Sequence, residues 1–185
     1  MKKILFLLLL CVLLFTSCVM VVDNDEFFTL DLIQEARERI LAENPGMAVS
    51  FLEFSAGIFE AGDAGKRKDT SIDDLVWWNF AFDCDNGQTA TISKEHGVWQ
   101  PSHITSLILP GSSIFDTDYL RIDLDEAIKI LKISHSGGGA AEGNLFDFVS
   151  FCQPLDPNVT EPLYIFHVGN GHFVSVGAIT GTVQK

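Results

Sequence analysis

The side chains best suited to metal binding or acid–base chemistry are five histidines and one short acidic segment. His167 and His172 flank a turn, and the register favoured below points them to opposite faces of a hairpin, so they are not expected to share a metal ion. Segment 83–86 resembles the start of a calcium loop, but Gly87 stands at the third ligand position and no Glu follows at the twelfth. The sequence therefore predicts no metal site and no cofactor.

Nucleophilic chemistry is not indicated either. No serine lies in a Gly-x-Ser-x-Gly elbow, and no Ser, His and acidic residue are spaced so that one orients the next. Cys84 and Cys152 lie in the part of the chain expected to fold, and an oxidising compartment permits a disulfide between them. Their apolar, strand-like surroundings equally favour two buried thiols. Histidines at zinc-ligand spacing are missing from the sequence around them. We predict that the protein is not an enzyme.

The N-terminal segment 1–18 predicts export and lipid attachment. Two lysines precede an apolar run that extends to Phe15, and two small residues then precede Cys18. This order is typical of a secretory signal peptide. It also resembles the lipobox of bacterial lipoproteins, with Phe15 where that motif usually has Leu. The resemblance implies that Cys18 becomes the first residue of the mature protein and is the lipid attachment site.

An uncleaved membrane anchor and simple secretion are the alternatives for this segment. A helix needs about 20 apolar residues to cross the hydrocarbon core of a bilayer, and the run here is interrupted from Thr16 onward. The acidic segment 19–27 suits a solvated tether, or a tag for export to the outer face. We predict a lipid-anchored protein of the bacterial outer membrane that faces the periplasm or the cell surface.

The charge balance narrows the choice of partners. The formal net charge is −13, and removing Lys2 and Lys3 with the signal takes it to −15. Nucleic acids and anionic membrane surfaces attract clustered Lys and Arg. The sequence therefore predicts no nucleic-acid partner and no membrane contact other than the lipid anchor, and it leaves basic proteins as possible partners.

The second half, residues 123–185, predicts a helix followed by strands. Asp123 and Glu126 form a capping-box pattern at the start of the helix, and apolar residues recur at helical spacing as far as Leu131. Three segments rich in aromatic or β-branched residues follow and are expected to be strands: 146–151, 163–168 and 173–179.

The last two of these strands flank Gly169-Asn170-Gly171, a strong hairpin signal. A two-residue turn would mix apolar and polar side chains on each face. A three-residue loop closed by Gly171 instead pairs Phe166 with Val174 and Tyr164 with Val176, which places nearly all large apolar residues on one face. The second register is therefore favoured.

The first half, residues 28–100, repeats this plan. Asp31 is expected to cap its helix, and 49–54 to form its first strand. The hairpin around Asn86-Gly87 aligns with the second hairpin at a constant offset of 84 residues, which predicts that Phe82 pairs with Ala90 as Phe166 pairs with Val174. An internal repeat is therefore predicted.

These patterns predict an α+β protein of two tandem modules, each a helix packed on a small antiparallel sheet of three to four strands. The modules are 28–100 and 123–185, and 101–122 is a linker whose apolar segment 104–109 suits an extra strand. A unit of about 60 residues has a thin core and is marginal alone; two such units side by side could share a sheet or a helix layer.

The second module resembles a PepSY domain. The likeness is carried by Leu124-Asp125-Glu126-Ala127 at the helix start, by segment 161–166, and by a last strand with Thr180-Gly181 and a closing Val183. The family often has Asp-Ala before that turn, where this chain has Gly177-Ala178. Tandem copies of the layout also resemble the β-lactamase inhibitor protein fold. The resemblance implies a non-catalytic module that binds or restrains proteases in the envelope or outside the cell.

Trp77 is the candidate binding residue. Trp78, Phe80 and Phe82 alternate onto one face, so Trp77 points the other way, toward solvent or the other module. Exposed tryptophan is enriched at binding hot spots, and packing between the halves is the alternative. The predicted function is a protein-binding envelope lipoprotein with an unidentified envelope partner, a peptidase being one candidate for inhibition. A structural or assembly lipoprotein without inhibitory activity is the alternative.

Overall fold

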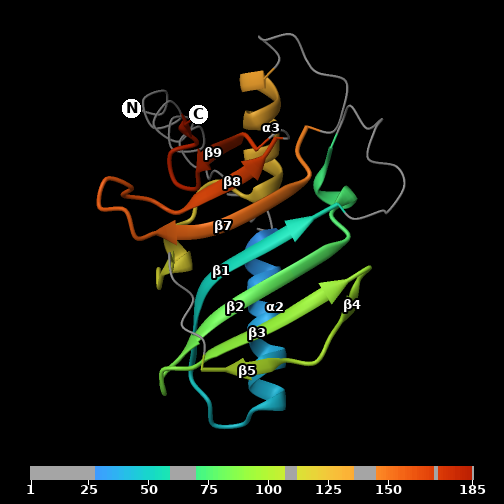
Figure 1. Ribbon diagram of the computed structural model, residues 1–185, viewed down its shortest axis with the longest axis vertical. Coiled ribbons are helices and arrows are strands. Elements are labelled where there is room, and N and C mark those ends of the chain that lie inside the picture. Colours follow the sequence, from blue (N-terminus) through green and yellow to red (C-terminus); the bar gives the residue numbers. More distant parts are fainter. Residues whose placement is uncertain (1–27, 59–69, 107–111, 136–144, 169–170, 185) are drawn as a thin grey trace, which may run out of the picture.

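The structure is a computed structural model that describes residues 28–58, 70–106, 112–135, 145–168 and 171–184. Two helices lie on one face of an antiparallel sheet to which both halves of the chain contribute (Figure 1). The strand order is β10-β9-β8-β7-β1-β2-β3-β4, with β5 also paired to β3 and β6 to β7. In chain order the elements are α2 (Phe28–Glu43), β1 (Val49–Gly57), η1 (Ile72–Asp74), β2 (Trp77–Cys84), β3 (Thr89–Glu95), β4 (Val98–Trp99), β5 (His103–Thr105), β6 (Ser112–Ser113), η2 (Thr117–Tyr119), α3 (Leu124–His135), β7 (Phe148–Pro154), β8 (Leu163–His167), β9 (Phe173–Gly177) and β10 (Val183–Gln184).

The prediction of two tandem modules, each with its own small sheet, is wrong, although the protein is broadly α+β. The first strands of the two halves, β1 and β7, pair antiparallel from Glu53 opposite Cys152 to Gly57 opposite Phe148. The sheet therefore runs without a break from β10 to β4. Separate sheets would each present an unpaired row of backbone N–H and C=O groups along β1 or β7, and joining the two edges satisfies both rows.

The core is shared for the same reason. A ladder of buried aromatic rings crosses β2, β1, β7 and β8 on the helix-covered face, in the order Phe80, Phe54, Phe151, Tyr164. Their successive ring centroids lie 5.9, 5.2 and 4.6 Å apart. Aromatic pairs at such distances stabilise by more than their buried area alone, so the junction between the halves is part of the core.

Both hairpin registers are confirmed. Phe82 lies opposite Ala90, and Phe166 lies opposite Val174. Each turn contains a glycine at the equivalent position, Gly87 with φ 75° and Gly171 with φ 74°. A positive φ is strained for residues with a Cβ, so these two glycines set the loop length that the alternating apolar pattern requires.

The two helices start in different ways. As predicted, Asp123 caps α3, since its carbonyl accepts from Ala127 N at 2.9 Å and its carboxylate from Leu124 N at 2.7 Å. The predicted cap at Asp31 is wrong, because α2 already begins at Phe28. The ring of Phe28 packs edge-on against Trp78 at 5.9 Å, so a tertiary contact adds the first residues of α2.

The predicted signal segment 1–18 with Cys18 and the tether 19–27 lie outside the described residues. Among the helices that the structure does describe, none has the length and apolar character needed to cross a membrane. Within the predicted linker 101–122, β5 pairs with β3 and overlaps the expected strand at its first two residues; segment 107–111 is outside the described residues.

Candidate functional site

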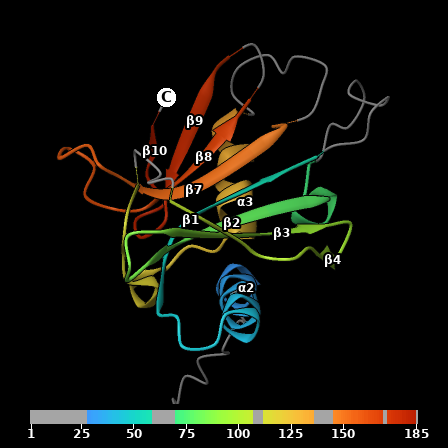
Figure 2. The same ribbon diagram turned by 60° about the horizontal axis from the view of Figure 1, so that its bottom comes forward.

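The candidate site is the face of the sheet opposite α2 and α3, here called the open face. Figure 1 shows both helices behind the sheet, and Figure 2 shows α2 along one side of β1, β2 and β3. None of the described helices covers the open face. Strand alternation places these central side chains on it: Glu53, Ser55, Trp77, Asn79, Asp83, Thr91, Ser93, Glu95, Phe148, Ser150, Cys152, Ile165, His167, Phe173 and Ser175.

Trp77 lies near the middle of the open face and bridges the two halves. Gly57 pairs with Trp77 on one side and with Phe148 on the other. A Cβ built on Gly57 would lie only 2.6 Å from Nε1 of the indole and 2.9 and 3.0 Å from two neighbouring ring carbons. The edge of the indole that carries Nε1 therefore packs over Gly57, and the indole stacks on the ring of Phe148 with centroids 6.0 Å apart and an interplanar angle of 21°.

The same row of the sheet continues across β8 and β9. Phe148 pairs with His167, and His167 pairs with Phe173. The rings of His167 and Phe173 lie 5.2 Å apart, and Phe173 is 56% exposed. The residues Trp77, Phe148, His167 and Phe173 are called the aromatic row below. It crosses the boundary between the halves, so neither half contains it alone.

A second row, adjacent to the aromatic row, consists largely of small polar side chains. Ser55 of β1 pairs with Asn79 of β2 on one side and with Ser150 of β7 on the other. Ser150 in turn pairs with Ile165, which pairs with Ser175. Short hydroxyl and amide side chains leave the sheet surface low and able to hydrogen-bond, which suits close approach by a second surface.

The open face carries acidic groups and histidines as its titratable side chains. Glu53, Asp83 and Glu95 lie on it, together with His103 and His167. No Lys or Arg belongs to the open face within the part of the chain that the structure describes. The described basic residues lie in the helices, before α3, or on the helix-covered side of β3: Arg37, Arg39, Lys94, Arg121, Lys129 and Lys132.

Glu161 adds a further carboxylate at one end of the open face. Its Oε2 accepts from the backbone N–H groups of Ile179 and Thr180, each at 2.9 Å, and its Oε1 accepts from the Thr180 hydroxyl at 2.6 Å. Burial alone would raise the pKa of Glu161, but these hydrogen bonds outweigh it and hold the pKa below its usual value. A Cβ at Gly177 would meet this carboxylate at 2.4 Å, so Glu161 occupies the space above Gly177.

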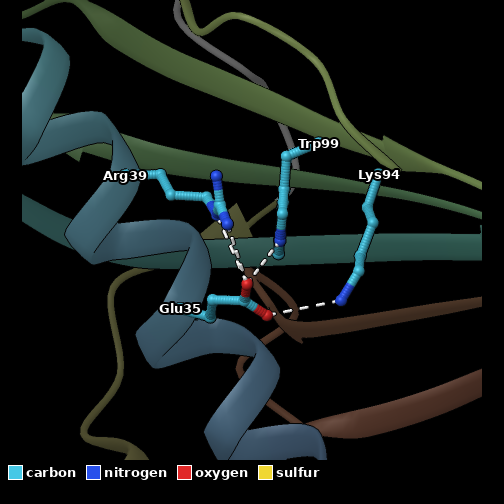
Figure 3. Close-up of polar contacts among 4 residues, drawn as sticks. All are labelled: Glu35, Arg39, Lys94 and Trp99. Atoms are coloured by element: carbon cyan, nitrogen blue, oxygen red, sulfur yellow. Dashed lines mark hydrogen bonds and ion pairs between the residues drawn. The ribbon is translucent and has the colours of Figure 1, made fainter. Parts of the chain in front are cut away.

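A second polar cluster lies on the helix side of the sheet (Figure 3). Oε1 of Glu35 accepts from the indole N–H of Trp99 at 2.6 Å and from Arg39 at 3.2 Å, and Oε2 lies 3.3 Å from Nζ of Lys94. The Arg39 and Lys94 cations lie 5.2 and 5.0 Å from the Trp99 ring centroid. The cluster connects α2 with β3 and β4, so its role is to hold the helix on the sheet.

The electrostatics of Glu35 agree with that role. Burial alone would raise the pKa of Glu35, but the hydrogen bonds from Trp99, Lys94 and Arg39 outweigh it and lower the pKa. The carboxylate is therefore held in its charged form with protein donors on both oxygens. Such a group binds its neighbours and has little capacity left to move a proton.

The candidate residues predicted from the sequence lie on both faces of the sheet. Trp77 points away from the core, as expected, and it also packs between the halves; its part in binding stays a prediction. Cys84 is buried on the helix side, whereas Cys152 is half-buried on the open face, and the two are not joined by a disulfide. Within the described residues, no group of three or more His, Cys, Asp or Glu side chains is arranged to hold a metal ion.

Sequence reasoning missed the partners of Trp77 in the aromatic row. The available signal was that Phe148 and Phe173 fall out of phase with the core pattern of their strands, as Trp77 does. No protein-family model, curated protein or solved structure matches the chain. The candidate site therefore rests on the geometry and charge of this chain alone.

Proposed function

We propose that the protein is a non-catalytic, lipid-anchored binding module that docks a partner protein of the bacterial cell envelope on its open face. The observation that carries the proposal is an uninterrupted sheet face that spans both halves and bears aromatic side chains at its centre. Exposed aromatic and apolar groups surrounded by polar ones are typical of protein–protein interfaces. Tryptophan in particular is enriched among residues that dominate binding energy.

The acidic character of the open face supports a protein partner over other macromolecules. Glu53, Asp83 and Glu95 would repel phosphate groups of nucleic acids and of anionic lipids. Glu35 and Glu161 accept hydrogen bonds from groups of this chain, which gives both carboxylates a structural role.

Two sequence features support the proposed location at the membrane of the cell envelope. Cys18 is the proposed lipid attachment site, and segment 19–27 separates it from α2. Nine residues span at most about 30 Å when fully extended, so the start of α2 would stay within that distance of the lipid anchor. Replacing Cys18 by Ala is expected to abolish incorporation of labelled fatty acid and to release the protein from the membrane fraction. Retention of both would contradict the lipid anchor.

The PepSY resemblance supports a peptidase as one candidate partner. The family often has an acidic residue at the position of Gly177, and the Glu161 carboxylate fills the space above that glycine. This chain lacks the family's Asp, so any role of that Asp is absent, and Glu161 comes from a different position of the chain. Inhibition of a peptidase and a structural role in the envelope differ in the identity of the partner, which the experiment below determines.

The test is site-specific photo-crosslinking in cells that produce the full-length chain. Benzoylphenylalanine is placed at Ser55 on the open face or, as a control, at Ala42, which is exposed on α2. The proposal expects a discrete crosslinked protein from Ser55 and none from Ala42. Binding of that purified partner should weaken at least tenfold with Ser55→Lys and stay unchanged with Ala42→Lys. Crosslinks from Ala42 alone, or equal effects of both lysines, would overturn it.

The identified partner then separates the two functional alternatives. If it is a peptidase and the wild-type chain lowers its activity in proportion to occupancy, the protein is an inhibitor. If it is an assembly or cell-wall protein, the module has a structural role. Either result is compatible with docking on the open face.

A further inference from the structure

The aromatic row and its acidic neighbours indicate the chemistry of the partner. We infer that the row receives a cationic segment of the partner protein, with Lys or Arg side chains laid against the rings of Trp77, Phe148 and Phe173. The inference rests on the proposed function and adds to it which part of the open face dominates binding and which side chains it recognises.

The ring geometry suits a cation. The edge of the Trp77 indole that carries Nε1 packs over Gly57, and the side chain is only partly buried, so it leaves aromatic surface on the open face. The near-parallel stack of Trp77 on Phe148 extends this surface across β1, and the exposed ring of Phe173 continues it beyond His167. A guanidinium or ammonium group is attracted to such ring faces when it lies within about 6 Å of a centroid.

Carboxylates flank the row on both sides of the centre. Glu95 pairs directly with Trp77 on β3, and Asp147 immediately precedes Phe148, with its side chain 55% exposed. Asp147 Oδ2 also lies 4.0 Å from Nδ1 of His167. A cation on the rings would therefore have one carboxylate near Trp77 and another near Phe148 and His167, and an acidic segment would be repelled there.

The same charge distribution argues against a second copy of this chain as the occupant. The open face carries Glu53, Asp83 and Glu95 and, among the described residues, no Lys or Arg, so two open faces brought together would set one acidic surface against another. Like charges in contact across an interface are strongly unfavourable. A partner of opposite charge meets no such penalty.

The helix side of the same molecule already shows this recognition. There the Trp99 ring has the cations of Arg39 and Lys94 at 5.2 and 5.0 Å, and the Glu35 carboxylate binds both cations (Figure 3). Trp77 with Glu95 offers the aromatic and acidic components of a similar arrangement on a face that looks outward.

The test uses the full-length chain in nonionic detergent micelles and two defined peptides. One seven-residue peptide alternates Arg with Leu, and the other has Glu at every Arg position. We expect the Arg peptide to shift the NMR signals of the Trp77 indole N–H and of the His167 and Phe173 amides, with an affinity that falls as salt is added. The Glu peptide should shift none of them.

Three variants test whether the Arg peptide binds at the aromatic row. Phe173→Ser and Glu95→Gln are each expected to weaken binding of the Arg peptide at least fivefold. Ile133→Ser removes an apolar side chain that is 75% exposed on α3 and should leave binding unchanged. Absence of shifts in the row, equal binding of the two peptides, or insensitivity to Phe173→Ser overturns the inference.

The test of cationic recognition can fail while the test of the proposed function succeeds, and the reverse also holds. If the crosslinked partner is displaced by Ser55→Lys but binds Phe173→Ser and Glu95→Gln as tightly as the wild type, the docking face stands and the cationic recognition fails. If Ser55 captures no protein while the Arg peptide still binds the row, the recognition chemistry stands and the proposed docking of an envelope protein fails.

Discussion

The backbone N–H of Thr29 in the first turn of α2 donates to the carboxylate of Asp123, the N-cap of α3, at 3.2 Å, and the Thr29 hydroxyl donates to the same oxygen. The N-termini of the two helices thus meet at one carboxylate, although the residues are 94 positions apart. Thr29 is 1% exposed. The halves are therefore coupled at two places, along β1–β7 in the sheet and at this junction.

Tyr164 extends this junction toward the sheet. Its hydroxyl donates to the carbonyl of Ile122 at 2.9 Å. Burial, together with the negative charge of Asp123, raises the pKa of Tyr164 well above its ordinary range. The phenol therefore stays protonated at any physiological pH and keeps its role as a donor.

The first prediction concerns Asp123 and its counterpart in the first half, Asp31. Asp123→Ala removes a helix cap and the acceptor of Thr29, so it is expected to lower the free energy of unfolding by about 2–3 kcal/mol. Asp31 is exposed within α2, so Asp31→Ala should change the free energy of unfolding by less than about 0.5 kcal/mol. Urea unfolding of the full-length chain measures both, and equal losses would contradict the junction.

The second prediction concerns pH and Glu161. Because the pKa of Glu161 is lower in the folded state than its ordinary value of 4.5, the contribution of Glu161 to the free energy of unfolding is fully present above that ordinary value. The contribution is lost as the pH falls through the folded pKa. The melting temperature of the wild type should therefore fall more steeply from pH 5 to pH 3 than that of Glu161→Gln. Glu126→Gln, an exposed change on α3, should follow the wild-type profile.

The third prediction tests the close approach of Glu161 to Gly177. Gly177→Ala puts a methyl group into the space of the carboxylate and should destabilise the protein by about 1–3 kcal/mol. Combining it with Glu161→Ala removes the clash, so the double variant should be more stable than the sum of the single effects by at least about 1 kcal/mol. Additive losses in a double-mutant cycle would show that the two groups do not collide.

The fourth prediction concerns the Glu35 cluster. Trp99→Phe keeps an aromatic ring but removes the N–H that donates to Glu35 at 2.6 Å. Since the Glu35 side chain is 41% exposed, solvent screens the interaction, and a loss of about 1 kcal/mol is expected. Chemical unfolding at low and at high salt measures it. An unchanged stability at both salt concentrations would mean that the cluster does not hold α2 on the sheet.

The fifth prediction uses the two thiols as reporters of the two sheet faces. Cys84 is 1% exposed, and burial raises its pKa, so little thiolate forms. Cys152 is half-buried on the open face. A maleimide should label Cys152 at least tenfold faster than Cys84 in the native protein, as mapped by peptide mass. A partner on the open face should slow only Cys152. Equal labelling rates would place both thiols in similar surroundings.

The hairpins show how much of the fold was open to prediction. Pairing of Phe82 with Ala90 and of Phe166 with Val174 depends on residues less than ten positions apart and on one glycine in each turn. Local alternation and turn chemistry determine such registers. The orientation of Trp77 follows from the same alternation, since Trp78 enters the core.

The rest of the candidate site could not be predicted from the sequence, and the reason is physical. Trp77 and Phe148 stack only because β1 pairs with β7, and Gly57 leaves space for the indole between them. That pairing joins strands about 95 residues apart, and in the sequence either strand could equally end a small sheet. Likewise, α2 begins at Phe28 instead of Asp31 because Trp78 and Asp123, both distant in the chain, contact its first turn.

The amino-acid sequence by itself determined the local elements: the order helix, strand, hairpin in each half, the cap at Asp123, the turns at Gly87 and Gly171, and the acidic charge. Only the tertiary structure decided that the two halves share one sheet and one core, and that the aromatic row and the adjacent row of mostly small polar side chains lie together on its open face. Local elements follow from nearest-neighbour chemistry, whereas the union of two strand edges depends on burying aromatic surface and backbone groups from both halves at once.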